Sequence, residues 1–163
     1  MGCEMRLIIC AVGHRMPGWV AAGFEEYASR MPREAAIELM EIRPEPRPAK
    51  PSPAIITKII AAEGKRMLAC LPVDCFTIAL DERGKALNSE QFAQSLQEWM
   101  RSGRDVAFLI GSADGLDQRL KQNASLMLSL ASMTLPHQLV RVLLAEQLYR
   151  ATCLLRNHPY HRA

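Results

Sequence analysis

The chain has 163 residues, of which 49% are hydrophobic and 23% are charged, and its formal net charge is +3. These values are typical of one compact globular domain over residues 1–163, and so small a charge excess does not by itself indicate nucleic-acid binding. Since no apolar run approaches the roughly 20 residues of a membrane helix, we expect no membrane contact and a cytoplasmic location.

Strand and helix signals alternate along the chain. The strand signals are short apolar runs, and the helix signals are apolar residues spaced three or four apart. We expect strands at 5–12, 36–42, 76–80, 106–110 and 126–133, and helices at 18–30, 54–69, 88–100, 116–122 and 137–155. This alternation predicts an α/β fold with a mainly parallel sheet and helices on both faces.

Residues 43–53 contain five prolines, which exclude a helix or a central strand and predict an extended, mobile surface loop. This loop lies in the first of two basic zones. The cations are Arg43, Arg47, Lys50, Lys58, Lys65 and Arg66 in one zone, and Arg141, Arg150, Arg156 and Arg162 in the other. Either zone could attract phosphate, and the alternative is an ordinary solvated surface. For the proline loop we expect contacts to RNA phosphates.

Three loops should meet at one edge of the sheet: the loop after Leu80, the turn at 111–115 and the loop at 132–137. In open α/β sheets ligands bind beyond the carboxyl ends of the strands, so a cofactor is expected here. No GxGxxG follows the first strand, which argues against a Rossmann-type nucleotide site. Gly111 and Gly115 can take positive φ angles beside a ligand, although a simple tight turn is the alternative.

Several runs carry a resemblance to one family. They are AVGHRMPGWV, GFEEY, TIALDERGK, GRDVAFLIGSADGL, TLPHQLVRVLLAEQLYRA and the ending NHPYHR. Over nearly its whole length the chain resembles the ribosomal RNA large-subunit methyltransferase H family, pseudouridine N3-methyltransferases of the SPOUT superfamily. The resemblance implies a deep C-terminal trefoil knot, S-adenosylmethionine as cofactor, a homodimer, and 23S rRNA of the assembled ribosome as substrate.

The resemblance also implies a set of cofactor-binding residues, most of which would use backbone groups. They are Leu80, Asp81, Gly111, Ser112, Ala131, Ser132, Met133, Thr134, Leu135 and Pro136. The side chains agree in part with this role. Thr134 offers a hydroxyl, and Met133 and Leu135 can line an apolar slot for adenine.

The turn at 111–115 departs from the family pattern. The family has Gly-Gly-Pro-Glu-Gly where this chain has Gly111-Ser112-Ala113-Asp114-Gly115. A serine forced into a glycine-only φ would cost about 1 kcal/mol or more. This departure favours one rival hypothesis, a non-catalytic ribosome-associated RNA-binding protein that has kept the fold.

The catalytic candidates lie in the tail, residues 157–163. Tyr160 offers a stacking ring, His161 a titratable imidazole and Arg162 a cation that would favour the N3 anion of the target base. The resemblance implies that this tail reaches the partner subunit's active site. The helix at 137–155 is apolar on more than one side, which is consistent with a subunit interface. We expect no metal site, since His158 and His161 lack further ligands and the cysteines form no CxxC pair.

Overall fold

The structure is a computed structural model that describes residues 5–162, apart from the side chain of His161. Its strands form a five-stranded sheet in the order β2-β1-β4-β3-β5, and neighbouring strands are parallel throughout. The strands are β1 (Leu7–Val12), β2 (Ile37–Ile42), β3 (Phe76–Ala86), β4 (Val106–Ile110) and β5 (Leu126–Ser129). The expected α/β class with a parallel sheet is therefore confirmed.

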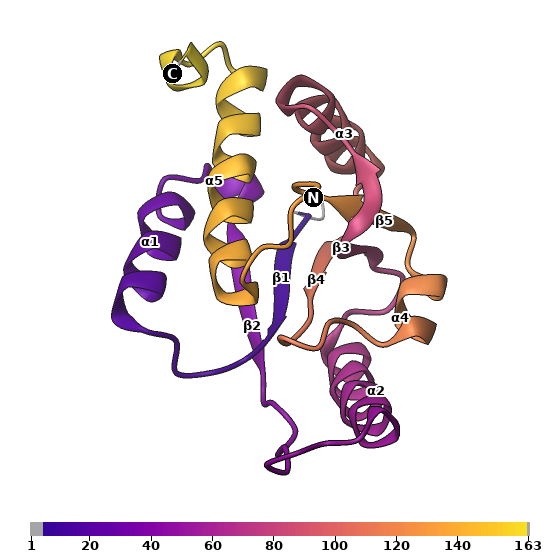
Figure 1. Ribbon diagram of the computed structural model, residues 1–163. Coiled ribbons are helices and arrows are strands. Elements are labelled where there is room, and N and C mark those ends of the chain that lie inside the picture. The colour runs from indigo at the N-terminus through magenta and orange to yellow at the C-terminus, as the bar shows by residue number, and fades with distance from the viewer. Residues whose placement is uncertain (1–4, 163) are drawn as a thin grey trace.

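Helices cover both faces of the sheet (Figure 1). They are α1 (Gly18–Ala28), α2 (Pro53–Cys70), α3 (Ser89–Ser102), α4 (Gln118–Asn123) and α5 (His137–Leu155), with short 3-10 helices η1 (Arg33–Ala35) and η2 (Pro159–Arg162). The central strand β1 is buried along its whole length, and its side chains alternate between two cores. Leu7 and Ile9 pack with α1, α3 and α5, whereas Ile8 and Cys10 pack with residues of α2 and α4.

Local signals fix where two of these helices begin. The Ser52 hydroxyl accepts a hydrogen bond from the Ile55 amide at 3.3 Å, and Pro53 occupies the first turn of α2. Asn88 and Gln91 form a reciprocal capping box at the start of α3. Gly103 ends α3 in the left-handed conformation, with φ at 70°.

The sheet differs from expectation at its β3–β5 edge. Strand β3 runs on to Ala86 through the expected polar turn, and β5 ends at Ser129 rather than at 133. Leu80 and Lys85 both pair with Leu128, so residues 81–84 loop out between the two pairings. A Cβ on Gly84 would lie 2.7 Å from the backbone of Leu128, so this close approach requires glycine. Composition does not reveal such a contact, because it depends on a distant strand.

In the part of the chain that the structure describes, no helix is both long enough and apolar enough to cross a membrane.

Candidate cofactor pocket and C-terminal tail

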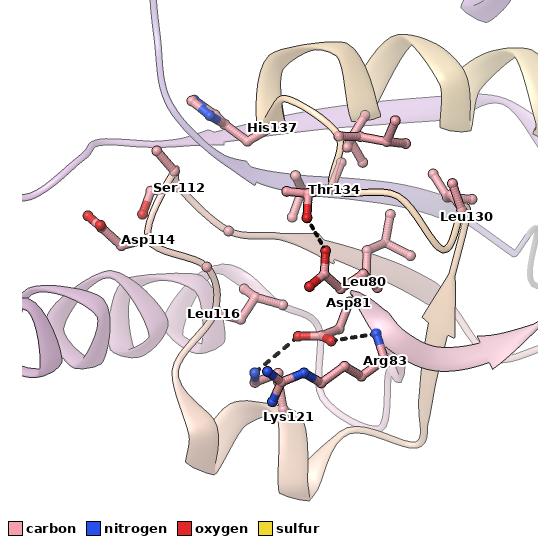
Figure 2. A pocket seen from close by; sticks show the side chains of 18 of the residues that line it. Leu80, Asp81, Arg83, Ser112, Asp114, Leu116, Lys121, Leu130, Thr134 and His137 are labelled. Carbon is pink, nitrogen blue, oxygen red and sulfur yellow. Dashed lines mark hydrogen bonds and ion pairs between the residues drawn. The ribbon is translucent and has the colours of Figure 1, made fainter.

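A cavity of about 380 Å³ is lined by residues 80–83 of β3, by the turn that follows β4 and by the loop that follows β5. Three loops contribute to it, as the sequence predicts, and the first turn of α5 closes it (Figure 2). The expected cofactor residues that line it are Leu80, Asp81, Gly111, Ser112, Ala131, Met133, Thr134 and Leu135. Ser132 and Pro136 lie in the same loop but do not line the cavity.

The 111–115 turn is tight for two different reasons. A Cβ on Gly111 would lie 2.5 Å from the backbone carbon and oxygen of Gly115, so Gly111 is needed for space. Gly115 has a φ of 89° and donates its amide to the Ser112 carbonyl at 2.9 Å. Our expectation of a positive φ holds for Gly115 and is wrong for Gly111. Ser112 is also outside the positive-φ region, so the expected strain of this substitution is absent.

Carboxylates of the 81–84 loop within β3 line the cavity. Asp81 accepts a hydrogen bond from the Arg83 amide at 2.8 Å and from the Lys121 ammonium at 3.1 Å. Burial opposes ionisation of Asp81, but these two hydrogen bonds outweigh it and lower its pKa below the ordinary value. Glu82 accepts a hydrogen bond from the Thr134 hydroxyl, which ties the first loop to the third (Figure 2).

His137 is the first residue of α5 and lines the cavity beside Val140. Burial, together with the positive charges of Arg141 and Arg47, lowers its pKa. The imidazole is therefore neutral at pH 7 and can accept a hydrogen bond from a ligand.

Arg47 is exposed, yet its guanidinium is held by other segments of the chain. It contacts Asp114 at 2.8 Å, the Ser112 hydroxyl at 2.8 Å and Glu63 at 3.0 Å. At this residue the proline loop therefore folds back onto α2 and the 111–115 turn. Arg43 and Lys50 are also exposed, and the expected contacts of the loop with RNA phosphates stay a prediction.

The tail folds onto the C-terminal half of α5 as η2. The Tyr160 hydroxyl donates to Glu146 at 3.0 Å, and its ring centroid lies 4.8 Å from that of Tyr149. The Arg150 guanidinium bonds the same carboxylate at 2.6 Å and lies 5.1 Å from the centre of the Tyr160 ring. Arg162 is exposed, and the side chain of His161 lies outside the described residues.

The profile of a family described as a predicted SPOUT methyltransferase matches residues 5–161. The ribosomal RNA large subunit methyltransferase H of Burkholderia multivorans is 57% identical over 159 residues, which cover 98% of this chain and 100% of that protein. The protein of the same name from Nitrosospira multiformis is 53% identical with the same coverage. The chain belongs to the ribosomal RNA large subunit methyltransferase H family.

One solved structure resembles this family member in fold alone. It is a probable methylase family protein from Haemophilus influenzae, with a TM-score of 0.54 and 13% sequence identity. The match covers 96% of this chain and 70% of that one.

Within one chain of this methyltransferase, the pocket is lined by His137 at the start of α5, whereas η2 follows the other end of that helix (Figure 1). Helix α5 has 19 residues, so His137 and Leu155 are separated by about 27 Å at a rise of about 1.5 Å per residue. The structure thus gathers most expected cofactor residues and does not bring the expected catalytic residues near them.

Sequence reasoning missed several residues around the pocket. Lys121 lies on the short helix α4 and has no local signal, because its carboxylate partner is 40 residues earlier. His137 belongs to the TLPH run and could have been chosen from that motif. Arg47 lies in the loop that its prolines predict to be mobile, and no local signal indicates its contacts with Glu63, Ser112 and Asp114.

Proposed function

We propose that this chain transfers the methyl group of S-adenosylmethionine to N3 of a pseudouridine in 23S rRNA of the assembled large ribosomal subunit. The observation that carries this proposal is full-length identity of more than half to proteins named ribosomal RNA large subunit methyltransferase H. The enzyme is a SPOUT methyltransferase that depends on S-adenosylmethionine.

The cavity fits this cofactor by its size and its donor set. Its volume lies within the usual range of small-molecule sites, roughly 300–1,000 Å³. Leu80, Met133 and Leu135 supply apolar surface for adenine, and the Thr134 hydroxyl and Glu82 carboxylate can bind ribose hydroxyls. When bound, S-adenosylmethionine supplies an electrophilic methyl group on a positively charged sulfur.

The residues of this chain would act by alignment and by electrostatics. Pocket and tail would hold the methyl donor and the target base in line, which removes much of the entropic barrier. Arg162 would stabilise the base after it loses the N3 proton, because a nearby cation favours the anion. His161 is the second candidate, as a general base. Tyr160, held by Glu146, would position this end of the tail and offer a ring for stacking.

We propose that the enzyme is a homodimer with shared sites. The pocket lies at the N-terminal end of α5 and the tail follows its C-terminal end, so the tail would complete a site in a neighbouring subunit. Helix α5 offers half-buried apolar side chains for such an interface, among them Leu139, Val142 and Leu143.

We also propose a single domain over residues 1–163 with the deep trefoil knot expected from the sequence. The support is local. Leu80 and Lys85 both pair with Leu128, so the 81–84 loop lies against the end of β5, where a knotted chain would pass through it.

The deciding experiment supplies labelled S-adenosylmethionine and assembled ribosomes, then maps the modified base. We expect label at N3 of one pseudouridine in 23S rRNA. The rival hypothesis, a non-catalytic ribosome-associated RNA-binding protein, predicts ribosome binding without cofactor binding or label. The Ser112-Ala113-Asp114 departure favours that rival, but Ser112 lies outside the positive-φ region, so this serine adds no backbone strain.

A further inference from the structure

Arg47 joins three segments that are far apart in the sequence. It belongs to the proline loop, and it contacts Glu63 of α2 and both Ser112 and Asp114 of the turn after β4. Its Nε donates to Asp114 and its Nη2 donates to the Ser112 hydroxyl. Its Nη1 donates to Glu63 and to the Glu45 carbonyl. A planar guanidinium can reach separate partners in fixed directions, whereas a lysine ammonium is a single point charge.

The α2 end of this contact is a firm anchor. Glu63 is 1% exposed, and the same oxygen that binds Arg47 also accepts a hydrogen bond from the Glu45 amide at 3.1 Å. A buried carboxylate needs such partners to stay ionised. The proline loop is therefore fixed to the body of the protein at the point from which Arg47 reaches the turn.

The turn end of the contact involves two side chains. Ser112 and Asp114 both bind the guanidinium of Arg47. Because the same guanidinium also binds Glu63, it cross-links the turn after β4 to α2.

We propose that Arg47 is a positioning residue for the cofactor pocket, a role that rests on the proposed function. Ser112 and Asp114 line the cavity, whereas Arg47 does not. Arg47 therefore acts through the turn, by holding it in the cofactor-binding conformation before the cofactor arrives. Without Arg47 the turn must be ordered on binding, which weakens affinity and leaves the chemical step unaltered.

The test measures the Kd of S-adenosylhomocysteine by calorimetry and kcat on ribosomes at saturating S-adenosylmethionine. For Arg47→Gln we expect Kd to rise about tenfold, the loss of one charge-assisted hydrogen bond, with kcat nearly unchanged. Arg47→Lys should not restore affinity, whereas Asp114→Glu, which keeps the carboxylate, should preserve it. The double variant Arg47→Gln/Asp114→Ala should bind no more weakly than Arg47→Gln.

Arg66→Gln is the matched control. Arg66 also ties the proline loop to α2, through the Arg43 carbonyl and the Glu45 carboxylate, but it does not touch the turn. We expect its Kd to equal that of the wild type. An equal rise for Arg66→Gln would overturn the proposal, since loosening the loop would then suffice.

Asp114→Ala guards against a folding defect in Arg47→Gln, because it leaves the Arg47–Glu63 pair in place. A wild-type Kd for Asp114→Ala, or additive losses in the double variant, would also refute the positioning role. If the wild-type chain binds no S-adenosylhomocysteine, the proposed function itself fails and this inference fails with it.

Discussion

At the residue scale, Arg141 is the most unexpected side chain of the core. It is 1% exposed, and its Nη1 lies 3.1 Å from Glu41, while Nε and Nη2 have no hydrogen-bond partner among the described residues. Our assignment of Arg141 to a solvated basic zone is therefore wrong. Arg141 precedes Leu144, Ala145 and Leu148 by three, four and seven positions, so it lies on the same buried face of α5. The helical spacing of the sequence therefore predicts its burial.

This pair joins a buried cation to a partly exposed carboxylate and predicts an asymmetry in stability. Glu41→Ala leaves the Arg141 charge buried and unpaired, and we expect a loss in the free energy of unfolding, smaller than for a fully buried pair because solvent screens Glu41. Arg141→Met removes the charge while keeping an apolar side chain, and should cost less. Denaturant unfolding of both single variants and of the double variant measures these changes in the free energy of unfolding. Equal losses for the two single variants would contradict it.

Tyr160 predicts a pH-dependent release of the tail. Burial and its hydrogen bond to Glu146 raise the pKa of this phenol. The pKa of Tyr160 is higher in the folded protein than in the unfolded chain, where it is about 10. The stability that Tyr160 contributes is therefore complete below about pH 10 and is lost as the pH rises further. Tail contact should therefore persist at neutral pH and weaken in strong alkali.

Carboxypeptidase digestion at increasing pH measures that release. The wild-type tail should become susceptible only above about pH 10. Tyr160→Phe lacks the hydroxyl and should be susceptible already at neutral pH. A tail that is digested equally in both proteins at pH 7 would show that the Glu146 contact does not hold it.

At the scale of elements, the sequence specified most of the fold through local chemistry. The apolar run of β1 and the capping residues Ser52 and Asn88 can be read directly from residue types. The extension of β3 and the early end of β5 could not be, since both depend on pairing with Leu128. The cofactor loops were found by resemblance and topology, whereas the contacts of Arg47 and Lys121 depend on partners 40 or more residues away.

The proline loop offers the exposed cations Arg43 and Lys50, beside the anchored Arg47, to a nucleic-acid partner. Neutralising Arg43 and Lys50 together should weaken ribosome binding and lower the salt slope by up to about two units. Cofactor affinity should stay unchanged, because neither residue lines the pocket. Binding measured over a series of salt concentrations checks this, and an unaltered slope would mean that the loop only faces solvent.

At the scale of the whole molecule, the separation of pocket and tail predicts complementation between subunits. One variant lacks residues 157–163, and the other carries Ala131→Trp, which fills the cofactor cavity. Each homodimer should be inactive. After subunit exchange, a heterodimer holds one intact pocket facing one intact tail, so methylation should return in part.

The control for this experiment is the extent of exchange, followed by native mass spectrometry with two differently tagged chains. Cofactor binding by the truncated chain should equal that of the wild type. If heterodimers form, both chains are folded and methylation is still absent, the tail of one subunit does not complete the pocket of the other, and the shared site is wrong.

The place of α5 in the chain also decides when the protein can fold. Leu144, Ala145 and Leu148 share one core with Leu7 and Ile9 of β1, from which they are far removed in the sequence. Until α5 docks, only α1 and α3 cover this face of the sheet. Folding therefore requires contacts of high sequence separation, which form slowly. A chain that ends before α5 would present that face to solvent and should aggregate.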